Sequence, residues 1–333
     1  MTRLENRLSR MELFDIGEAF IDDFIASYDS EPDSIIIDAD DTNADTYGAQ
    51  QITLFNAYYG KYCYMPLLLF EGRSGKLILP ILRPGRGNKA INISGLLKQL
   101  ITKLRKKWKH TQIIVRGDSH FCSHDFMDWA TEQQDGIHFI TGLAGNVKLQ
   151  KITAHWLDTA VASYKASGEE VRLFHSFMYK ADSWKHLQRV VVKIEVNSLG
   201  TNVRYVVTDL KGQRSSFIYS ECYCDRGRME QMIAELKNGL KADRMSCNKF
   251  SANQFRLYLH CAAYVILHSF QADMLVGTEL VCCTITTMRE KMLLSAVSID
   301  EKKTCIRIRF SQKTPMLPEM VSVLARLQHL TSS

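Results

Sequence analysis

The sequence is poor in residues that break or cross-link secondary structure. Its 333 residues include only 6 Pro and 18 Gly, which excludes a fibrous or low-complexity chain. The 9 Cys include no Cys-x-x-Cys pair and no Cys/His cluster with the spacing of zinc ligands, so we expect no structural zinc. Their odd number and scattered positions are typical of a reducing compartment rather than of a disulfide framework.

Long hydrophobic runs are missing as well. The apolar stretch at residues 65–70 is far too short to cross a bilayer. The charged first residues contain no apolar segment that could serve as a secretory leader. We therefore expect a cytoplasmic protein with no membrane partner.

The residues that are abundant are those of a packed globular protein. Hydrophobic residues make up 46% and charged residues 23% of the chain, a balance that can form a large core. A formal net charge of +6 permits a polyanionic partner but does not require one. The length predicts one large domain with an insertion, or two domains.

The hydrophobic pattern of the first half predicts an α/β fold. β-branched and apolar runs predict strands at residues 35–40, 62–70, 76–82, 112–118 and 137–141. Helical spacing and capping residues predict helices at residues 9–28, 92–108 and 123–134. Three strands followed by helix, strand, helix and strand is the order of an RNase H-like mixed sheet flanked by helices.

The second half changes character twice. Alternating apolar and polar residues at 171–177, 188–196 and 204–207 predict a mainly β insertion, and helical signal returns from about residue 225. The expected organisation is an N-terminal helical segment (1–34), the first part of the core (35–144), the insertion (145–205), the second part of the core (206–270) and a C-terminal helical region (271–333).

Two of the predicted strands end in acids. Asp38 and Asp40 lie two residues apart on the first strand and so share one face of it. Asp118 ends a second buried strand, within Arg116-Gly-Asp118-Ser. A carboxylate at such a place is costly unless it is paired or bound to a metal. Each acid alone could be a solvated turn residue, but their matching positions make Asp40 and Asp118 candidate ligands.

A third acid lies in the helical stretch that follows the insertion. Tyr223, Arg226, Glu230 and Lys237 are spaced by three, four and seven residues, which keeps them on one narrow helix face. Glu235 falls outside this face, so Glu230 is the better candidate. A solvated face with Arg–Glu pairing is the alternative. Three carboxylates on two strands and a helix favour Mg²⁺ or Mn²⁺ over zinc, and two such ions can support phosphoryl transfer.

These segments resemble the three motifs of bacterial insertion-sequence DDE transposases of the cut-and-paste type. The matching segments are Asp38-Ala-Asp40-Asp-Thr42, Arg116-Gly-Asp118-Ser and Tyr223-x-x-Arg226-x-x-x-Glu230-x-x-x-x-x-x-Lys237. The last agrees with the family's tyrosine–arginine–glutamate–lysine signature at every defined position. Phrases such as Phe55-Asn-Ala-Tyr58-Tyr59 point to the branch numbered thirteen-eighty.

The resemblance implies an activity, cofactors and partners. It implies metal-dependent cleavage at transposon ends followed by strand transfer from the freed 3′-hydroxyl, performed at the nucleoid. The expected partners are terminal inverted repeats, target DNA and a second copy of the chain on paired ends. Two Mg²⁺ ions, with Mn²⁺ as a substitute, are the implied cofactors. Their implied ligands are Asp40, Asp118 and Glu230, with Asp38 as the alternative first ligand, and the implied contacts to DNA phosphates are Tyr223, Arg226 and Lys237.

Family members usually carry a further N-terminal stretch that helps to bind the repeats, and this chain is expected to lack it. Two alternative functions follow. One is a truncated, catalytically silent DNA-binding remnant, and the other is an RNase H-fold nuclease without strand transfer. Arg83 and Arg86, beside a Pro-Gly turn, are further candidates for phosphate contacts, whereas Trp156 and Trp184 are expected to pack in the core rather than to stack on a flipped base.

Overall fold

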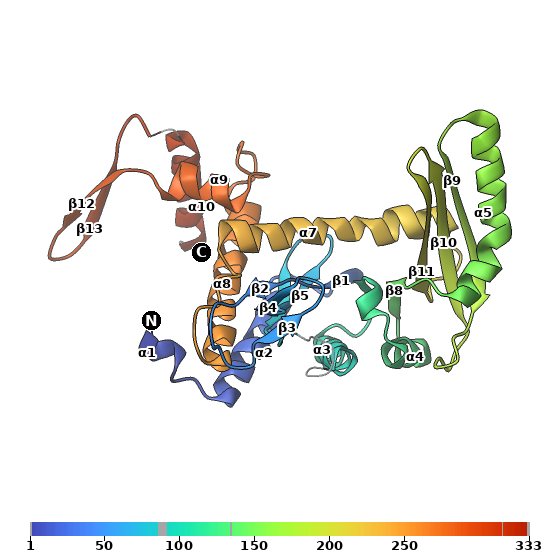
Figure 1. Cartoon of the computed structure of the whole chain (residues 1–333). Helices are drawn as coiled ribbons and strands as arrows, with labels where there is room; N and C mark the ends of the chain where they lie inside the picture. The colour runs from blue at the N-terminus through green and yellow to red at the C-terminus, as the bar shows by residue number, and fades with distance from the viewer. Residues whose placement is uncertain (1, 86–91, 134, 315, 332–333) are drawn as a thin grey trace.

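A computed structural model describes residues 2–85, 92–133, 135–314 and 316–331 of the chain. The core lies in the middle of an elongated molecule (Figure 1). The insertion stands at one end and the C-terminal region at the other. A long helical run, labelled α7 in Figure 1, connects these two ends across the core.

One mixed sheet of eight strands organises the described chain, in the order β6-β5-β1-β7-β8-β11-β10-β9. β1 pairs antiparallel with β5 and parallel with β7, and β7 pairs parallel with β8. This is the RNase H-like arrangement that the order of elements predicted. The five core strands are β1 (Ser34–Asp41), β5 (Leu67–Glu71), β6 (Leu77–Ile81), β7 (Gln112–Gly117) and β8 (Ile137–Leu143).

Successive residues of β1 point to opposite faces of the sheet, and each face carries a hydrophobic core. Ile35, Ile37 and Ala39 point into the first core, which is covered by helices on that face. Asp38 and Asp40 therefore point to the opposite face. The helices that pack into the first core are α2 (Arg10–Ala26), α3 (Ile93–Lys107), α4 (His124–Glu132) and α5 (Val147–Ser167).

The second core lies on the face to which the two acids point. Leu68 and Phe70 of β5 contribute to it from the sheet, together with Met229 and Leu236 of the helical run. This run is continuous from Ser215 to Gly239 and is called the site helix below. It comprises α6 (Ser215–Phe217), α7 (Gly227–Ala234), wide π-type turns at Ile218–Tyr223 and Glu235–Gly239, and a tight 3-10 turn at Cys224–Arg226.

The insertion extends the core sheet rather than forming a separate layer. β11 (Gly200–Thr208) pairs with β8, then with β10 (Gln188–Asn197), which pairs with β9 (Val171–Tyr179). All three strands were predicted, but helix α5 was not. α5 buries only Leu149, Thr153 and Ala160, so its apolar stripe is thin. Its capping residues, Asn146 before it and Gly168 after it, were the signals that could have revealed it.

Residues 62–70, predicted as one strand, are two strands in different sheets. β4 (Lys61–Tyr64) joins β2 (Ala44–Asp45) and β3 (Leu54–Asn56) in a small three-stranded sheet, and β5 belongs to the main sheet. The strand changes sheet at Met65-Pro66, where Pro66 has no N–H to continue a ladder. The small sheet begins three residues after the acidic end of β1, since β1 ends at Asp41 and β2 begins at Ala44.

The C-terminal region combines helices with a projecting hairpin. The elements outside those already named are α1 (Thr2–Glu5), α8 (Phe250–Ser269), α9 (Ile285–Met288), β12 (Val297–Glu301), β13 (Ile306–Phe310) and α10 (Leu317–Thr331). The β12–β13 hairpin extends away from the body (Figure 1). Among the described residues, no helix has the length and apolar character needed to cross a membrane.

Candidate active site

Asp38 is fully buried and both of its oxygens are bonded to one arginine. Arg116 Nε donates to Oδ1 at 2.5 Å and Nη2 donates to Oδ2 at 2.6 Å. Burial raises the pKa of Asp38, while the hydrogen bonds and charge of Arg116 act in the opposite direction. The same arginine donates from Nη1 to the carbonyl of Cys222 at 2.6 Å, within a wide turn of the site helix. Arg116 thus ties β1, β7 and the site helix together.

Gly72 makes room for this pair. A Cβ at that position would come within 2.6 Å of Asp38 Oδ2 and 2.7 Å of Arg116 Nη2. Glycine is therefore required here because of close approach, since the hairpin between β5 and β6 passes directly over a buried ion pair.

Asp40 lies on the same face as Asp38, one step closer to the end of the strand. Its Oδ2 accepts a hydrogen bond from Arg226 Nη1 at 2.8 Å, and its Oδ1 accepts from the Asp41 N–H at 2.9 Å. Its side chain keeps 15% exposure, whereas Asp38 has none. Burial raises the pKa of Asp40 to about 6, helped by the charge of Asp118 and opposed by Arg226.

Asp118 follows the parallel neighbour of β1. Ala39 and Gly117 are paired in the register of β1 and β7, so Asp40 and Asp118 are the next positions along two strands about 4.8 Å apart. Asp118 Oδ1 accepts the His120 N–H at 2.8 Å and so begins a tight turn at Ser119–Phe121. The structure therefore brings the first two predicted acids together at one edge of the sheet.

The site helix places three of its predicted residues against this edge. Lys237 Nζ lies 3.0–3.1 Å from Thr42 Oγ1 and from two oxygens of Asn43, in the segment just after β1. Tyr223 lies over the end of β8, where a Cβ on Gly142 would be 2.7 Å from its hydroxyl. With Arg226 on Asp40, both predicted phosphate-binding cations have partners within the chain.

Glu230 is not gathered with the other two acids. It is exposed and lies one turn, about 6 Å, beyond Arg226 on the site helix. Over the described residues, no three His, Cys, Asp or Glu side chains form a group able to hold a metal ion. Glu235 points elsewhere, because its Oε2 accepts the Ile285 N–H at 2.7 Å. Asp225 of the same helix has its Oδ2 3.6 Å from Arg116 Nη1.

The donor set of the first two acids fits a hard divalent cation. Two carboxylates lie at adjacent strand ends, and burial, with a further contribution from the charge of Asp118, raises the pKa of Asp40. A cation with oxygen ligands, such as Mg²⁺, would relieve this repulsion. Asp38, the alternative first ligand, is fully buried and accepts hydrogen bonds from Arg116 at both of its oxygens, whereas Asp40 keeps some exposure.

The prediction that Arg83 contacts phosphate is wrong. Its side chain is 1% exposed, donates from Nη2 to Asp41 Oδ2 at 2.5 Å and from Nε to the Met65 carbonyl at 3.2 Å. A buried guanidinium held by a carboxylate has no freedom to meet DNA. Arg86 lies outside the described residues.

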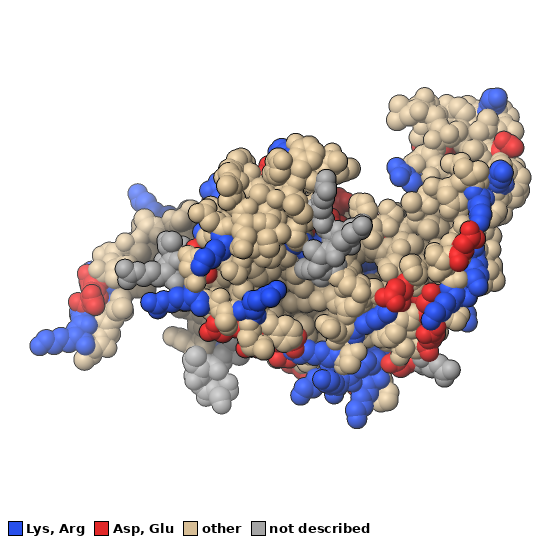
Figure 2. Space-filling view, turned by 60° about the horizontal axis from the view of Figure 1, so that its bottom comes forward, with Lys and Arg blue, Asp and Glu red and all other residues tan. Residues whose placement is uncertain are grey.

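The two tryptophans pack as expected of core residues. Trp156 stacks on His175 with ring centroids 4.4 Å apart, and Trp184 is 7% exposed against Tyr179. Figure 2, in which the bottom of Figure 1 comes forward, shows Lys and Arg side chains gathered where α3 lies. Part of this group is neutralised, since Lys98 pairs with Asp125 and Lys103 with Glu18.

Arg116 is a site residue that the sequence interpretation did not assign. A charged residue within the apolar run of β7 was the available signal, because a buried charge needs a counter-charge. In the parallel register it lies directly beside Asp38.

Comparison with known proteins supports one family. The chain matches the family described as Transposase DDE domain, group 1, over residues 1–332. No curated protein matches it. Among solved structures, the cryo-EM structure of the piggyBac transposase synaptic complex with hairpin DNA is similar, at 10% sequence identity and a TM-score of 0.44. The similarity covers 77% of this chain and 51% of that one, so the chain spans about half the length of that protein.

Removing the partner of Asp38 should strongly destabilise the fold. Arg116→Met leaves a fully buried carboxylate without a counter-charge, and we expect a loss of about 3–5 kcal/mol in the free energy of unfolding. Urea unfolding followed by circular dichroism measures it. The double variant Asp38→Leu, Arg116→Met should lose less than Arg116→Met alone, and additive losses would contradict the assignment of the pair.

Proposed function

The chain belongs to the group 1 DDE-domain transposases, and from this premise we propose that it cleaves DNA at transposon ends and joins the freed 3′-hydroxyl to target DNA. The observation that carries the proposal is the pair Asp40 and Asp118, set at adjacent strand ends under a helix that bears Arg226 and Glu230. We further infer, from the motif phrases, a bacterial insertion-sequence origin in the thirteen-eighty branch and a dimer on paired ends.

The proposed metal ligands are Asp40, Asp118 and Glu230. When bound, two Mg²⁺ ions, or Mn²⁺ in their place, would activate the attacking oxygen and stabilise the leaving oxygen of a phosphodiester. Asp40 and Asp118 are already held by the sheet. Glu230 is exposed and has no ion pair with a described residue, so its carboxylate is free to complete the donor set.

Arg226 has two roles in this proposal that exclude each other. Its Nη1 bonds Asp40 Oδ2 at 2.8 Å, so the same oxygen cannot hold a cation while that contact persists. Transfer of the guanidinium to a DNA phosphate frees the carboxylate. DNA binding and metal binding then favour each other, and by linkage the coupling is equal in both directions. Lys237, now bonded to Thr42 and Asn43, can shift to phosphate in the same way.

Loss of any proposed ligand should abolish cleavage and joining without unfolding the chain. We expect Asp40→Asn, Asp118→Asn and Glu230→Gln to give no cut or joined product from a labelled transposon-end duplex with Mg²⁺ or Mn²⁺, while circular dichroism is unchanged. Glu221→Gln, an exposed acid of the same helix, is the control that should retain both activities.

The products separate the proposed function from its alternatives. Cut product without joined product from the unaltered chain would indicate a nuclease, and neither product from a chain that binds DNA would indicate a silent remnant. Full cleavage by Asp118→Asn would overturn the assignment of the site.

Removing the guanidinium should make metal binding independent of DNA. Arg226→Gln leaves Asp40 without its competing cation, so we expect Mn²⁺ to bind about 5-fold or more tightly without DNA, as measured by electron paramagnetic resonance. DNA should raise the Mn²⁺ affinity of the unaltered chain and have less effect on the variant. Arg228→Gln, exposed on the same helix, is the control. Equal Mn²⁺ affinities for Arg226→Gln and the unaltered chain would contradict the competition.

A further inference from the structure

We propose that the small sheet β2–β4–β3 and the loop at residues 241–249 form a binding surface for unpaired DNA bases beside Asp40. This inference rests on the proposed function, because it assumes that DNA is the substrate. It assigns a role to an aromatic segment that neither the acids nor the site helix explains.

Exposed aromatic side chains cluster on the small sheet. Tyr47 is 87% exposed, Tyr58 88%, Tyr62 59% and Phe55 42%. Phe55 and Tyr62 are directly paired across β3 and β4, and their rings lie 5.5 Å apart in an edge-to-face arrangement. So many large rings in water on so small a sheet indicate a surface that a ligand covers.

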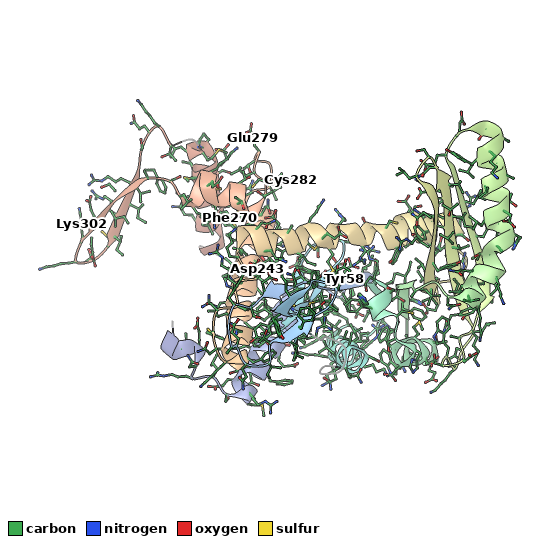
Figure 3. The ribbon with its side chains drawn as sticks, viewed as in Figure 1. Tyr58, Asp243, Phe270, Glu279, Cys282 and Lys302 are labelled. Carbon is green, nitrogen blue, oxygen red and sulfur yellow. The ribbon has the colours of Figure 1, made fainter. Side chains whose placement is uncertain are left out.

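The cluster lies close to the acidic end of β1, because β2 begins three residues after Asp41. Tyr59, at the tip of the β3–β4 hairpin, contacts Tyr58 edge to face with centroids 4.9 Å apart. Burial raises the pKa of Tyr59, and the nearby charges of Asp41 and Asp40 raise it further. Figure 3 labels Tyr58 near the middle of the molecule, where the core lies in Figure 1. A base stacked on Tyr58 would therefore belong to a strand that passes the acids.

Cations lie in the loop at residues 241–249, which is bonded to the connection between β2 and β3. Gln50 Nε2 donates to the Cys247 carbonyl at 2.8 Å, and the Gln51 N–H donates to the Asn248 carbonyl at 2.8 Å, which fixes the 241–249 loop to the sheet. The exposed cations of this loop have no ion pair with a described residue; they are Lys241, Arg244 and Lys249.

A polar hollow joins the cations to the aromatic side chains. It has a volume of about 610 Å³ and is lined by Tyr47, Arg244 and Arg256, with Asp45 and Asp243 also present. The charge of Asp45 is compensated by Lys61 at 2.7 Å. The backbone beside Tyr47 is bonded to that of Tyr62, because the Thr46 N–H donates to the Tyr62 carbonyl at 3.1 Å.

The chemistry of this surface favours single-stranded DNA. Proteins bind single strands by combining cations that follow the backbone with aromatic rings on which successive bases stack. Bases in a duplex are already stacked on each other and cannot offer a free face to Tyr58. Another exposed apolar surface, on the β12–β13 hairpin, is mostly aliphatic, and Phe310 is the one ring among its large exposed apolar residues.

Fluorescence anisotropy with a labelled oligothymidine, in chelator so that no cleavage occurs, tests the proposal. Because each stacked base contributes strongly to affinity, Tyr58→Ala and Tyr62→Ala should each weaken binding about 5- to 100-fold. Tyr58→Phe should retain binding, since it keeps the ring. Phe310→Ala, which removes a 40% exposed ring from the β12–β13 hairpin, is the matched control and should have no effect. Arg244→Gln should lower the salt dependence by about one ion.

Three outcomes would overturn the proposal. The first is unchanged oligothymidine binding by Tyr58→Ala and Tyr62→Ala. The second is that these variants lose affinity equally for a duplex of the same length. The third is that they differ from the unaltered chain in association state without DNA, measured by light scattering. The last would identify a contact between copies. Cleavage and joining of a transposon end by a chain that ignores oligothymidine would refute this surface and leave the proposed function intact.

Discussion

The site depends on the requirement that every carboxylate near the end of β1 has its own counter-charge. Asp38 is paired with Arg116 from β7, Asp40 with Arg226 from the site helix, and Asp41 with Arg83 beyond β6. Burial disfavours charged carboxylates, and an arginine from another element offsets that cost only when the element is correctly placed. The three ion pairs therefore hold β7, the site helix and the segment after β6 around the end of one strand.

Depth along the strand separates the acid of the buried ion pair, Asp38, from the proposed metal ligand, Asp40. Asp38 is two residues, about 6.6 Å, further inside than Asp40, so it is completely enclosed and both of its oxygens are satisfied by a single guanidinium. Asp40 retains some exposure and a single bond to Arg226. Two aspartates on the same face of β1 can thus differ in role. Asp38 anchors the site helix through Arg116, whereas the contact of Asp40 with Arg226 remains exchangeable.

Local patterns allowed prediction of the order of helices and strands along the core, the strands of the insertion, and the acids at the ends of β1 and β7. The patterns were insufficient where the position of a residue is determined by a partner far along the chain. Arg83 was expected to contact phosphate, but it pairs with Asp41, which is 42 residues away in the sequence. Helix α5 escaped because it buries few residues, and Pro66 divides a run that looks like one strand. Uniform spacing of 100° per residue also fails in the site helix, since its wide turns at Ile218–Tyr223 and Glu235–Gly239 each add about one residue to a turn.

The internal use of the site cations also explains why net charge says little about the proposed binding of DNA. Arg226 and Lys237 already bond oxygens of their own chain. The free energy that they contribute to phosphate binding is therefore reduced by the cost of breaking those bonds. In the proposed function, affinity for DNA must then come first from groups whose side chains form no hydrogen bond or ion pair with a described residue. The exposed rings of Tyr58 and Tyr62 and the cations of the 241–249 loop are such groups. If they engage the strand first, the exchange at Asp40 follows binding, and the acids become available only when DNA is in place.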